Sequence, residues 1–292
     1  MANLIVKDIS PAFGAEISGL EPKVPLDAET CAQLRTLFDE RSMLVFRGVD
    51  IDVQFQTYLS NMLIGDDASV PDELPIMKDF YVSNEKPKSA APFGRLMYHS
   101  DSQWAKDWCY ALSLYGEKVE QPSAPTMFVS SVVGWDTLPE DLRKRAEGQF
   151  VIHQHDPETY QKRAAGDPDV LLNDLKASED SDPQPIVLTH PRTGRKLLYI
   201  SQQMTRNVEG MSEQESDELL GVLFDHLYDK SKEMAHYWRQ GDLVVWDNIA
   251  LQHARPNVQS EGPARTLRKT IAPPPKVGAV ASLNYSKVGA AA

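Results

Sequence analysis

Two groups of histidines have neighbours that could bind a metal ion. In the first, His99-Ser100-Asp101, an imidazole and a carboxylate stand two residues apart. If this segment is extended, residues i and i+2 point to the same face, so that both groups can face one ion. The triplet alone is a weak signal, because most such pairs lie on a surface.

The second group is His153-Gln154-His155-Asp156, which would also place two imidazoles on one face of a strand. No third partner stands at a characteristic spacing from it, and we interpret it as a polar strand end. It leaves open an alternative function, a cupin-like hydrolase or isomerase that uses His153 and His155 with another metal.

A distant histidine can complete the first group. His253 follows an apolar run and the residues Trp246-Asp247-Asn248. A His-x-Asp pair with a remote histidine is the two-histidine, one-carboxylate set of non-haem Fe(II) oxygenases. Three ligands on one face leave three coordination positions for a chelating co-substrate and O₂. The basic run Arg265-Thr266-Leu267-Arg268-Lys269 would supply a counter-charge for a second carboxylate on that co-substrate.

The elements that must position these residues are mostly strands. Helices are indicated at 27–40, at 139–146, and at 212–228, where Ser212 and Glu215 form a capping-box pattern. Apolar runs predict strands near 4–6, 15–17, 42–47, 109–115, 126–133, 197–200, 242–246 and 265–272. Without regular βα alternation, a mainly β fold is favoured, an antiparallel sandwich or jelly roll with peripheral α-helices.

Composition narrows the classes of function. With 30 Lys+Arg against 42 Asp+Glu, the net charge of −12 argues against binding to nucleic acid. No apolar run approaches the roughly 20 residues of a membrane span. Two cysteines, Cys31 and Cys109, argue against a disulfide framework and a Cys-ligated zinc. We therefore expect a cytoplasmic protein without a signal peptide. A jelly roll that binds a ligand without a metal remains a third possible function.

We expect a single domain over residues 1–292. Residues 66–98 are rich in Pro, Lys and polar residues, with aromatic residues interspersed. We expect a long loop here, which is a candidate lid over an active site. A polar insertion is expected at 164–182 and a frayed tail at 273–292.

Several segments together resemble the taurine dioxygenase and 2,4-dichlorophenoxyacetate dioxygenase family of Fe(II)/2-oxoglutarate enzymes. The resemblance runs from about residue 5 to 272, and its matching segments are 38–48, 98–104, 190–199, 208–211, 241–253 and 265–269. It implies a double-stranded β-helix (jelly roll) core. It also implies that His99, Asp101 and His253 are the ligands of Fe(II).

The family chemistry would use 2-oxoglutarate and O₂ as co-substrates and release succinate and CO₂. The implied reaction is hydroxylation of a small, anionic substrate such as a carboxylate or sulfonate, with cleavage where the hydroxylated carbon bears a heteroatom. A homo-oligomer, from dimer to tetramer, is the family expectation.

The resemblance places Thr126 and Arg265 at the far carboxylate of 2-oxoglutarate. Arg268 is the alternative to Arg265, because the family spacing between the last histidine ligand and the arginine, counted from His253 without a gap, favours Arg268. Strand alternation puts Arg265 and Lys269 on one face and Arg268 on the other, so the two arginines cannot share one role. Lys269 stands where the family has a second arginine that often touches substrate.

Four further residues are candidates for contact with the substrate. Tyr81, Asn84 and Tyr98 lie in or beside the candidate lid. Trp104 stands where the family commonly has Phe, and the larger indole would reshape the pocket near the iron.

Overall fold

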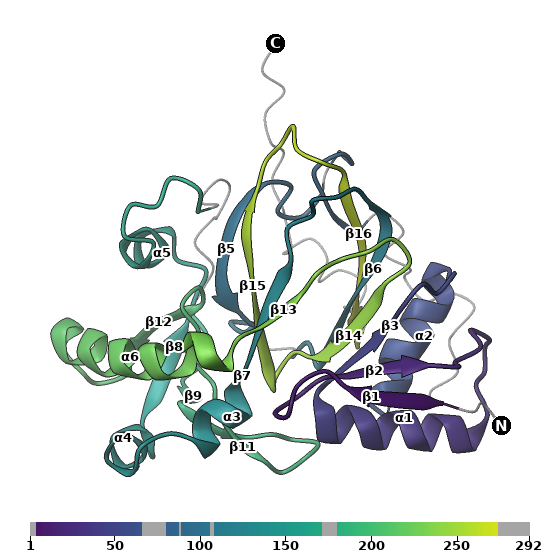
Figure 1. The fold of residues 1–292 in the computed structure, drawn as a ribbon. Helices are drawn as coiled ribbons and strands as arrows, with labels where there is room; N and C mark the ends of the chain where they lie inside the picture. The colour runs from purple at the N-terminus through teal and green to yellow at the C-terminus, as the bar shows by residue number, and fades with distance from the viewer. Residues whose placement is uncertain (1–3, 66–79, 88, 106–107, 171–179, 274–292) are drawn as a thin grey trace.

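The core of the protein is a pair of β-sheets that lie face to face. The computed structural model describes residues 4–65, 80–87, 89–105, 108–170 and 180–273. A seven-stranded and a four-stranded sheet form the two walls of a barrel-like core (Figure 1). The predicted jelly roll with peripheral helices is confirmed.

The larger sheet has the strand order β1-β2-β3-β14-β6-β16-β4. Its strands are β1 (Ile5–Asp8), β2 (Ala15–Ser18), β3 (Met43–Phe46), β14 (Leu243–Asp247), β6 (Ala111–Val119), β16 (Arg265–Ala272) and β4 (Tyr81–Ser83). All pairs are antiparallel except β2 with β3. Strands β3 and β14 are buried along their whole length and are apolar almost throughout, as expected for strands covered on both faces.

The smaller sheet has the order β13-β7-β15-β5, with β13 (Met234–His236), β7 (Thr126–Ser130), β15 (Leu251–Val258) and β5 (Gly94–His99). Its register places His253 of β15 opposite His99 of β5. Apolar side chains from the inner faces of both sheets, among them Phe128, Trp246 and Leu267, form one cluster. The two sheets therefore share a core, and the paired histidines lie at its edge.

Two helices pack on the outer face of the larger sheet. These are α1 (Ala28–Arg41) and α2 (Val53–Leu63), and each is capped by an aspartate, Asp27 and Asp52, whose side chain accepts a backbone N–H of the first turn. Their apolar side chains join those of β3 and β14 in a second cluster. Helix α1 confirms the prediction for 27–40, whereas α2 was not predicted.

The remaining elements lie beside the smaller sheet (Figure 1). They are α3 (Ser131–Asp136), α4 (Glu140–Ala146), β8 (Phe150–His153), α5 (Pro157–Arg163), β9 (Gln184–Pro185), β10 (Val187–Thr189), β11 (Lys196–Leu198), β12 (Thr205–Val208), α6 (Glu213–Leu227) and a 3₁₀ turn at Lys230–Lys232. Helix α6 begins with the predicted capping box between Ser212 and Glu215.

The three segments expected outside the core fall partly beyond the described residues. Of the candidate lid 66–98, residues 66–79 and 88 are not described, and the rest includes the core strands β4 and β5. Of the insertion 164–182, residues 171–179 are not described, while Asp167 pairs with Arg95 of β5 at 2.8 Å. Nearly all of the tail, 274–292, also lies outside. Among the described helices, none is long and apolar enough to cross a membrane.

Candidate metal and co-substrate site

Three side chains converge at the edge of the core. His99 ends β5, Asp101 lies in the turn that follows, and His253 faces them from β15. Nε2 of His99 lies 3.2 Å and Nε2 of His253 lies 3.6 Å from Oδ1 of Asp101. One ligand atom from each residue lies within 4.8 Å of the others. This spacing and these donors suit a divalent metal that accepts nitrogen and oxygen ligands.

The protonation states of these groups also suit a metal. Burial alone would raise the pKa of Asp101, but the ammonium of Lys269 and the two imidazoles hold it well below its ordinary value. Burial, together with the neighbouring His99, lowers the pKa of His253 far below its ordinary value. Asp101 is therefore an anion and His253 a neutral imidazole, as metal binding requires.

Neighbouring groups fix the orientation of the cluster. Nδ1 of His99 lies 2.8 Å from the carbonyl of Met97, which leaves Nε2 directed at the cluster. The carboxamide of Asn248 accepts the N–H of Asp101 at 3.0 Å and donates to its carbonyl at 2.9 Å. The ammonium of Lys269 pairs with Oδ2 of Asp101. Buried Nδ1 of His253 has no hydrogen-bond partner among the described residues.

A buried arginine and a hydroxyl lie on the same inner face. Arg265 donates from its Nε to the carbonyl of Ala124 at 3.1 Å and from its terminal nitrogen to Oγ1 of Thr126 at 3.3 Å. The indole of Trp238 also donates to Oγ1 of Thr126, at 2.9 Å. In the described part of the chain, Arg265 has no carboxylate partner. Burial, reinforced by the charge of Arg255, lowers the pKa of Arg265 well below its ordinary value. A dianionic ligand would offset this unpaired buried charge.

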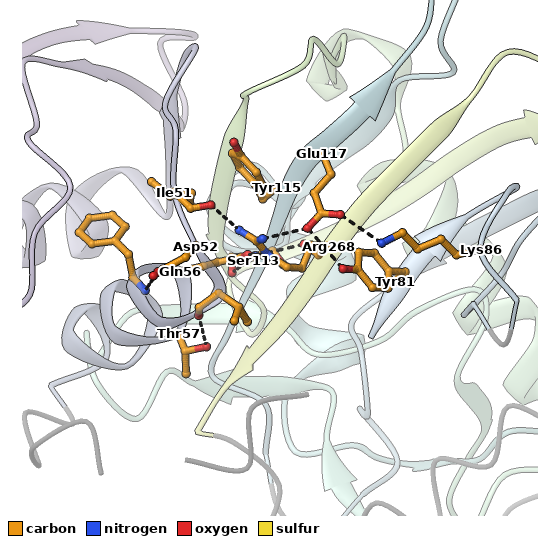
Figure 2. A network of polar contacts seen from close by, with 12 residues as sticks. Ile51, Asp52, Gln56, Thr57, Tyr81, Lys86, Ser113, Tyr115, Glu117 and Arg268 are labelled. Atoms are coloured by element: carbon orange, nitrogen blue, oxygen red, sulfur yellow. Dashed lines mark hydrogen bonds and ion pairs between the residues drawn. The ribbon is translucent and has the colours of Figure 1, made fainter. Parts of the chain in front are cut away.

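Arg268 points to the opposite face of β16, as strand alternation predicts. Its guanidinium donates to the side chain of Gln56 at 2.8 Å, to Glu117 at 2.8 Å and to the carbonyl of Ile51 at 2.9 Å (Figure 2). The ring of Tyr115 lies 4.7 Å from it. These contacts fasten α2 to the outer face of the larger sheet, away from the metal cluster.

Three of the substrate candidates make other contacts. Tyr81 donates to Glu117 at 3.3 Å, within the network of Figure 2. Asn84 donates to the carbonyl of Pro263 at 3.0 Å and accepts the N–H of Arg265 at 2.9 Å. Tyr98 donates to Glu233 and stacks on a neighbouring tyrosine, on the face of β5 opposite His99. The structure brings none of the three into contact with the metal cluster.

The second histidine group is divided between two environments. His153 is fully buried, and its Nδ1 lies 3.2 Å from Oγ1 of Thr205. His155 packs against Trp104, with 5.6 Å between ring centroids, and burial together with the charge of His99 lowers its pKa to about 4. Among the described residues, His153 and His155 join no group of three possible metal ligands. The structure thus places Trp104 and His155 together near the first cluster.

Asn248 and Trp238 are residues at this site that the sequence did not reveal. Asn248 stands in the segment that ends at His253, and a carboxamide offers both a donor and an acceptor. Its partner depends on how the turn at Asp101 folds back, which the residue types alone do not show. Trp238 was equally hidden, because an isolated Trp in a β protein is most simply explained as a core residue.

Comparison with known proteins gives consistent matches. The family model described as "Taurine catabolism dioxygenase TauD, TfdA family" matches residues 5–271. An α-ketoglutarate-dependent 2,4-dichlorophenoxyacetate dioxygenase of Cupriavidus pinatubonensis is 26% identical over 86% of this chain and 91% of its own. An α-ketoglutarate-dependent sulfate ester dioxygenase of Pseudomonas putida is 24% identical over 94% of this chain and 91% of its own. The crystal structure of a taurine dioxygenase from Burkholderia xenovorans superposes with a TM-score of 0.71 at 22% identity, over 92% of this chain and 90% of that one.

Proposed function

The chain belongs to the taurine catabolism dioxygenase TauD, TfdA family and is an Fe(II)- and 2-oxoglutarate-dependent dioxygenase, and we propose that His99, Asp101 and His253 hold its iron. The observation that carries the proposal is the convergence of these three side chains from two paired strands and the turn that follows β5. With Fe(II), 2-oxoglutarate and O₂ bound, the site oxidises a substrate C–H bond while 2-oxoglutarate is decarboxylated to succinate and CO₂.

Thr126 and Arg265 are proposed to hold the far carboxylate of 2-oxoglutarate. The planar guanidinium can donate two parallel N–H bonds to one carboxylate, which an ammonium cannot do in the same plane. The hydroxyl of Thr126 already lies beside this guanidinium. The contacts of Arg268 with Gln56, Glu117 and Ile51 leave it a structural role, which supports Arg265 for the co-substrate.

The substrate is proposed to be a small anion. Two buried cations, Arg265 and Arg255, lie in or next to this site, and neither pairs with a carboxylate among the described residues. Together with Fe(II), these cations outnumber the negative charges of Asp101 and 2-oxoglutarate. A substrate carboxylate, sulfonate or sulfate ester would reduce that excess. The names of the two relatives described above, which specify an aryloxyacetate and sulfate esters, support this class.

The protein side chains position the metal and the bound molecules and exclude water from the site. Asp101 and the two histidines would hold the metal, and a set of three protein ligands would leave positions for the co-substrates. Trp104 and His155 are proposed to form a wall of the substrate pocket, because their packed rings lie close to the cluster. A homo-oligomer and a cytoplasmic location stay predictions, which light scattering and fractionation would test.

The test is a screen for succinate release. The purified chain is supplied with Fe(II), 2-oxoglutarate and O₂ and a panel of sulfonates, sulfate esters and aryloxy acids, and the mass of each product is measured. The proposal expects substrate-dependent succinate that the His99→Ala and Asp101→Ala variants do not produce. Equal metal binding by the wild type and both variants would show that the ligand set is wrong.

A further inference from the structure

The two oxygens of Asp101 have different neighbours. Oδ1 faces the imidazoles, 3.2 Å from Nε2 of His99 and 3.6 Å from Nε2 of His253. Oδ2 pairs with the ammonium of Lys269. One oxygen is therefore presented to the metal position, while the other is held by a cation from a different strand.

The position of Lys269 is fixed from several directions. The residue is 7% exposed, and its ammonium lies 4.8 Å from the centroid of the Phe80 ring. Its backbone N–H donates to the carbonyl of Phe80 at 2.9 Å. On the outer face of the same strand, Gln56 donates to the carbonyl of Arg268 at 3.1 Å and accepts from its guanidinium (Figure 2). The ammonium is thus held at Asp101 by a rigid strand.

We propose that Lys269 is a positioning residue that keeps Asp101 a one-oxygen ligand of the metal, which rests on the proposed function in taking Asp101 as a ligand. A carboxylate can bind a cation through one oxygen or through both. If Asp101 used both, it would take a fourth coordination position. Only two would then remain for the chelating co-substrate and O₂, where three are needed. With Oδ2 engaged by Lys269, Oδ1 alone is offered.

The experiment counts the water molecules on bound Mn(II), which accepts the same ligand types as Fe(II). The wild type and the Lys269→Met variant are saturated with Mn(II) without 2-oxoglutarate, and water-proton relaxation is measured. If Asp101 takes a second coordination position in the variant, one of three bound waters is lost, and the relaxation enhancement falls by about one third. The Lys269→Arg variant keeps a cation at Oδ2 and restores the wild-type value.

Binding of 2-oxoglutarate to the Mn(II)-loaded proteins is the second readout. Lys269→Met is expected to weaken it by about tenfold, the usual effect of removing a partner of a metal ligand. Lys118→Met is the matched control, because Lys118 is exposed on β6 and pairs with Glu85 at 2.6 Å, on the surface. Lys118→Met leaves both readouts at the wild-type value.

The outcomes separate this proposal from the function on which it rests. An unchanged relaxation value in Lys269→Met, at saturating Mn(II), overturns the role of Lys269 while the ligand set stands. Absence of Mn(II) binding by the wild type overturns the ligand set itself, and the role of Lys269 with it. If Lys269→Met does not fold, as judged by circular dichroism, the neutral Lys269→Gln variant replaces it in the same comparison.

Discussion

Asn248 binds both polar groups of the Asp101 backbone. Its Oδ1 accepts the N–H of Asp101 at 3.0 Å, and its Nδ2 donates to the carbonyl of Asp101 at 2.9 Å. The same Nδ2 donates to the carbonyl of Cys109 at 3.0 Å. Ser102, directly after Asp101, has a positive φ of 58°, which is unusual for a residue with a side chain. This pair of hydrogen bonds, which we call the Asn248 clamp, therefore stabilises a strained turn that directs the Asp101 carboxylate at the two histidines.

The Asn248→Ala variant is expected to bind Mn(II) about 10-fold to 100-fold more weakly, because Asp101 loses the group that orients it. An electron paramagnetic resonance titration of free Mn(II) measures this affinity. Asn207→Ala is the matched control, since the side chain of Asn207 donates to the carbonyl of its neighbour Val208 on β12. Equal Mn(II) affinity in Asn248→Ala and Asn207→Ala would exclude the role of the clamp.

Arg265→Met is expected to weaken binding of 2-oxoglutarate by about 100-fold. Removing one partner of a buried, hydrogen-bonded charge pair costs about 2–5 kcal/mol, and each 1.4 kcal/mol is about tenfold in affinity. Calorimetric titration of 2-oxoglutarate into the Mn(II)-loaded protein measures the effect. The Mn(II) affinity itself should change little, because Arg265 does not contact the three ligands.

Arg268→Met should have the opposite profile. The substitution removes the guanidinium contacts with Glu117 and Gln56 and is expected to lower the free energy of unfolding by about 3 kcal/mol. Urea unfolding measures this loss, while the folded variant keeps nearly the wild-type affinity for 2-oxoglutarate. If Arg268→Met lost 2-oxoglutarate binding and Arg265→Met kept it, the assignment of the two arginines would be reversed.

The donor types at the metal cluster made it predictable from sequence. His-x-Asp and a remote His are chemically specific, and alternation along β16 correctly separated Arg265 and Lys269 from Arg268. The same alternation, applied to β5, would have turned Tyr98 away from the face of His99. Tyr81 and Asn84 could not be judged in this way, because their hydroxyl and carboxamide are used by partners distant in sequence.

Helix α2 was not predicted for a related reason. Four of its buried positions are polar, so that the usual alternation of apolar and polar faces is obscured; they are Gln56, Thr57, Ser60 and Asn61, and Ser113 lies opposite them on β6. In a sequence, a hydroxyl residue at such a position predicts an exposed side chain. In the structure, Ser60 is buried and donates to Ser113 of the neighbouring strand.

Trp104→Ala should raise the KM of whichever substrate the screen identifies, by about tenfold. The indole packs on His155 beside the metal cluster, and loss of an apolar aromatic contact costs about 1.5–3 kcal/mol. Tyr98→Phe is the control, because it removes only the hydrogen bond to Glu233 on the opposite face of β5. Steady-state kinetics measure the KM of both variants. A larger increase of KM in Tyr98→Phe than in Trp104→Ala would contradict the placement of the pocket.

His153 couples the stability of the fold to pH. Burial, reinforced by the charge of Arg163, lowers the pKa of His153 from 6.5 to about 3. In the unfolded chain the imidazole takes up a proton near pH 6.5, whereas in the folded protein it stays neutral down to about pH 3. The unfolded state therefore binds more protons across this window, and the free energy of unfolding falls as the pH drops through it.

Between pH 7 and pH 5, His153 alone should cost about 2 kcal/mol of stability, at 1.36 kcal/mol for each pH unit below 6.5. The His153→Phe variant loses the contact with Thr205 and is less stable at pH 7, but this deficit should shrink by about 2 kcal/mol at pH 5. Thr205→Val removes the same contact and keeps the titrating ring, so its deficit should be equal at both values. Urea unfolding followed by tryptophan fluorescence measures all three proteins. The pKa values of Asp101, Asp242 and Asp247 are lowered from 3.8, so these carboxylates do not contribute between pH 7 and pH 5. A deficit of His153→Phe that stays constant between the two pH values would rule out the coupling.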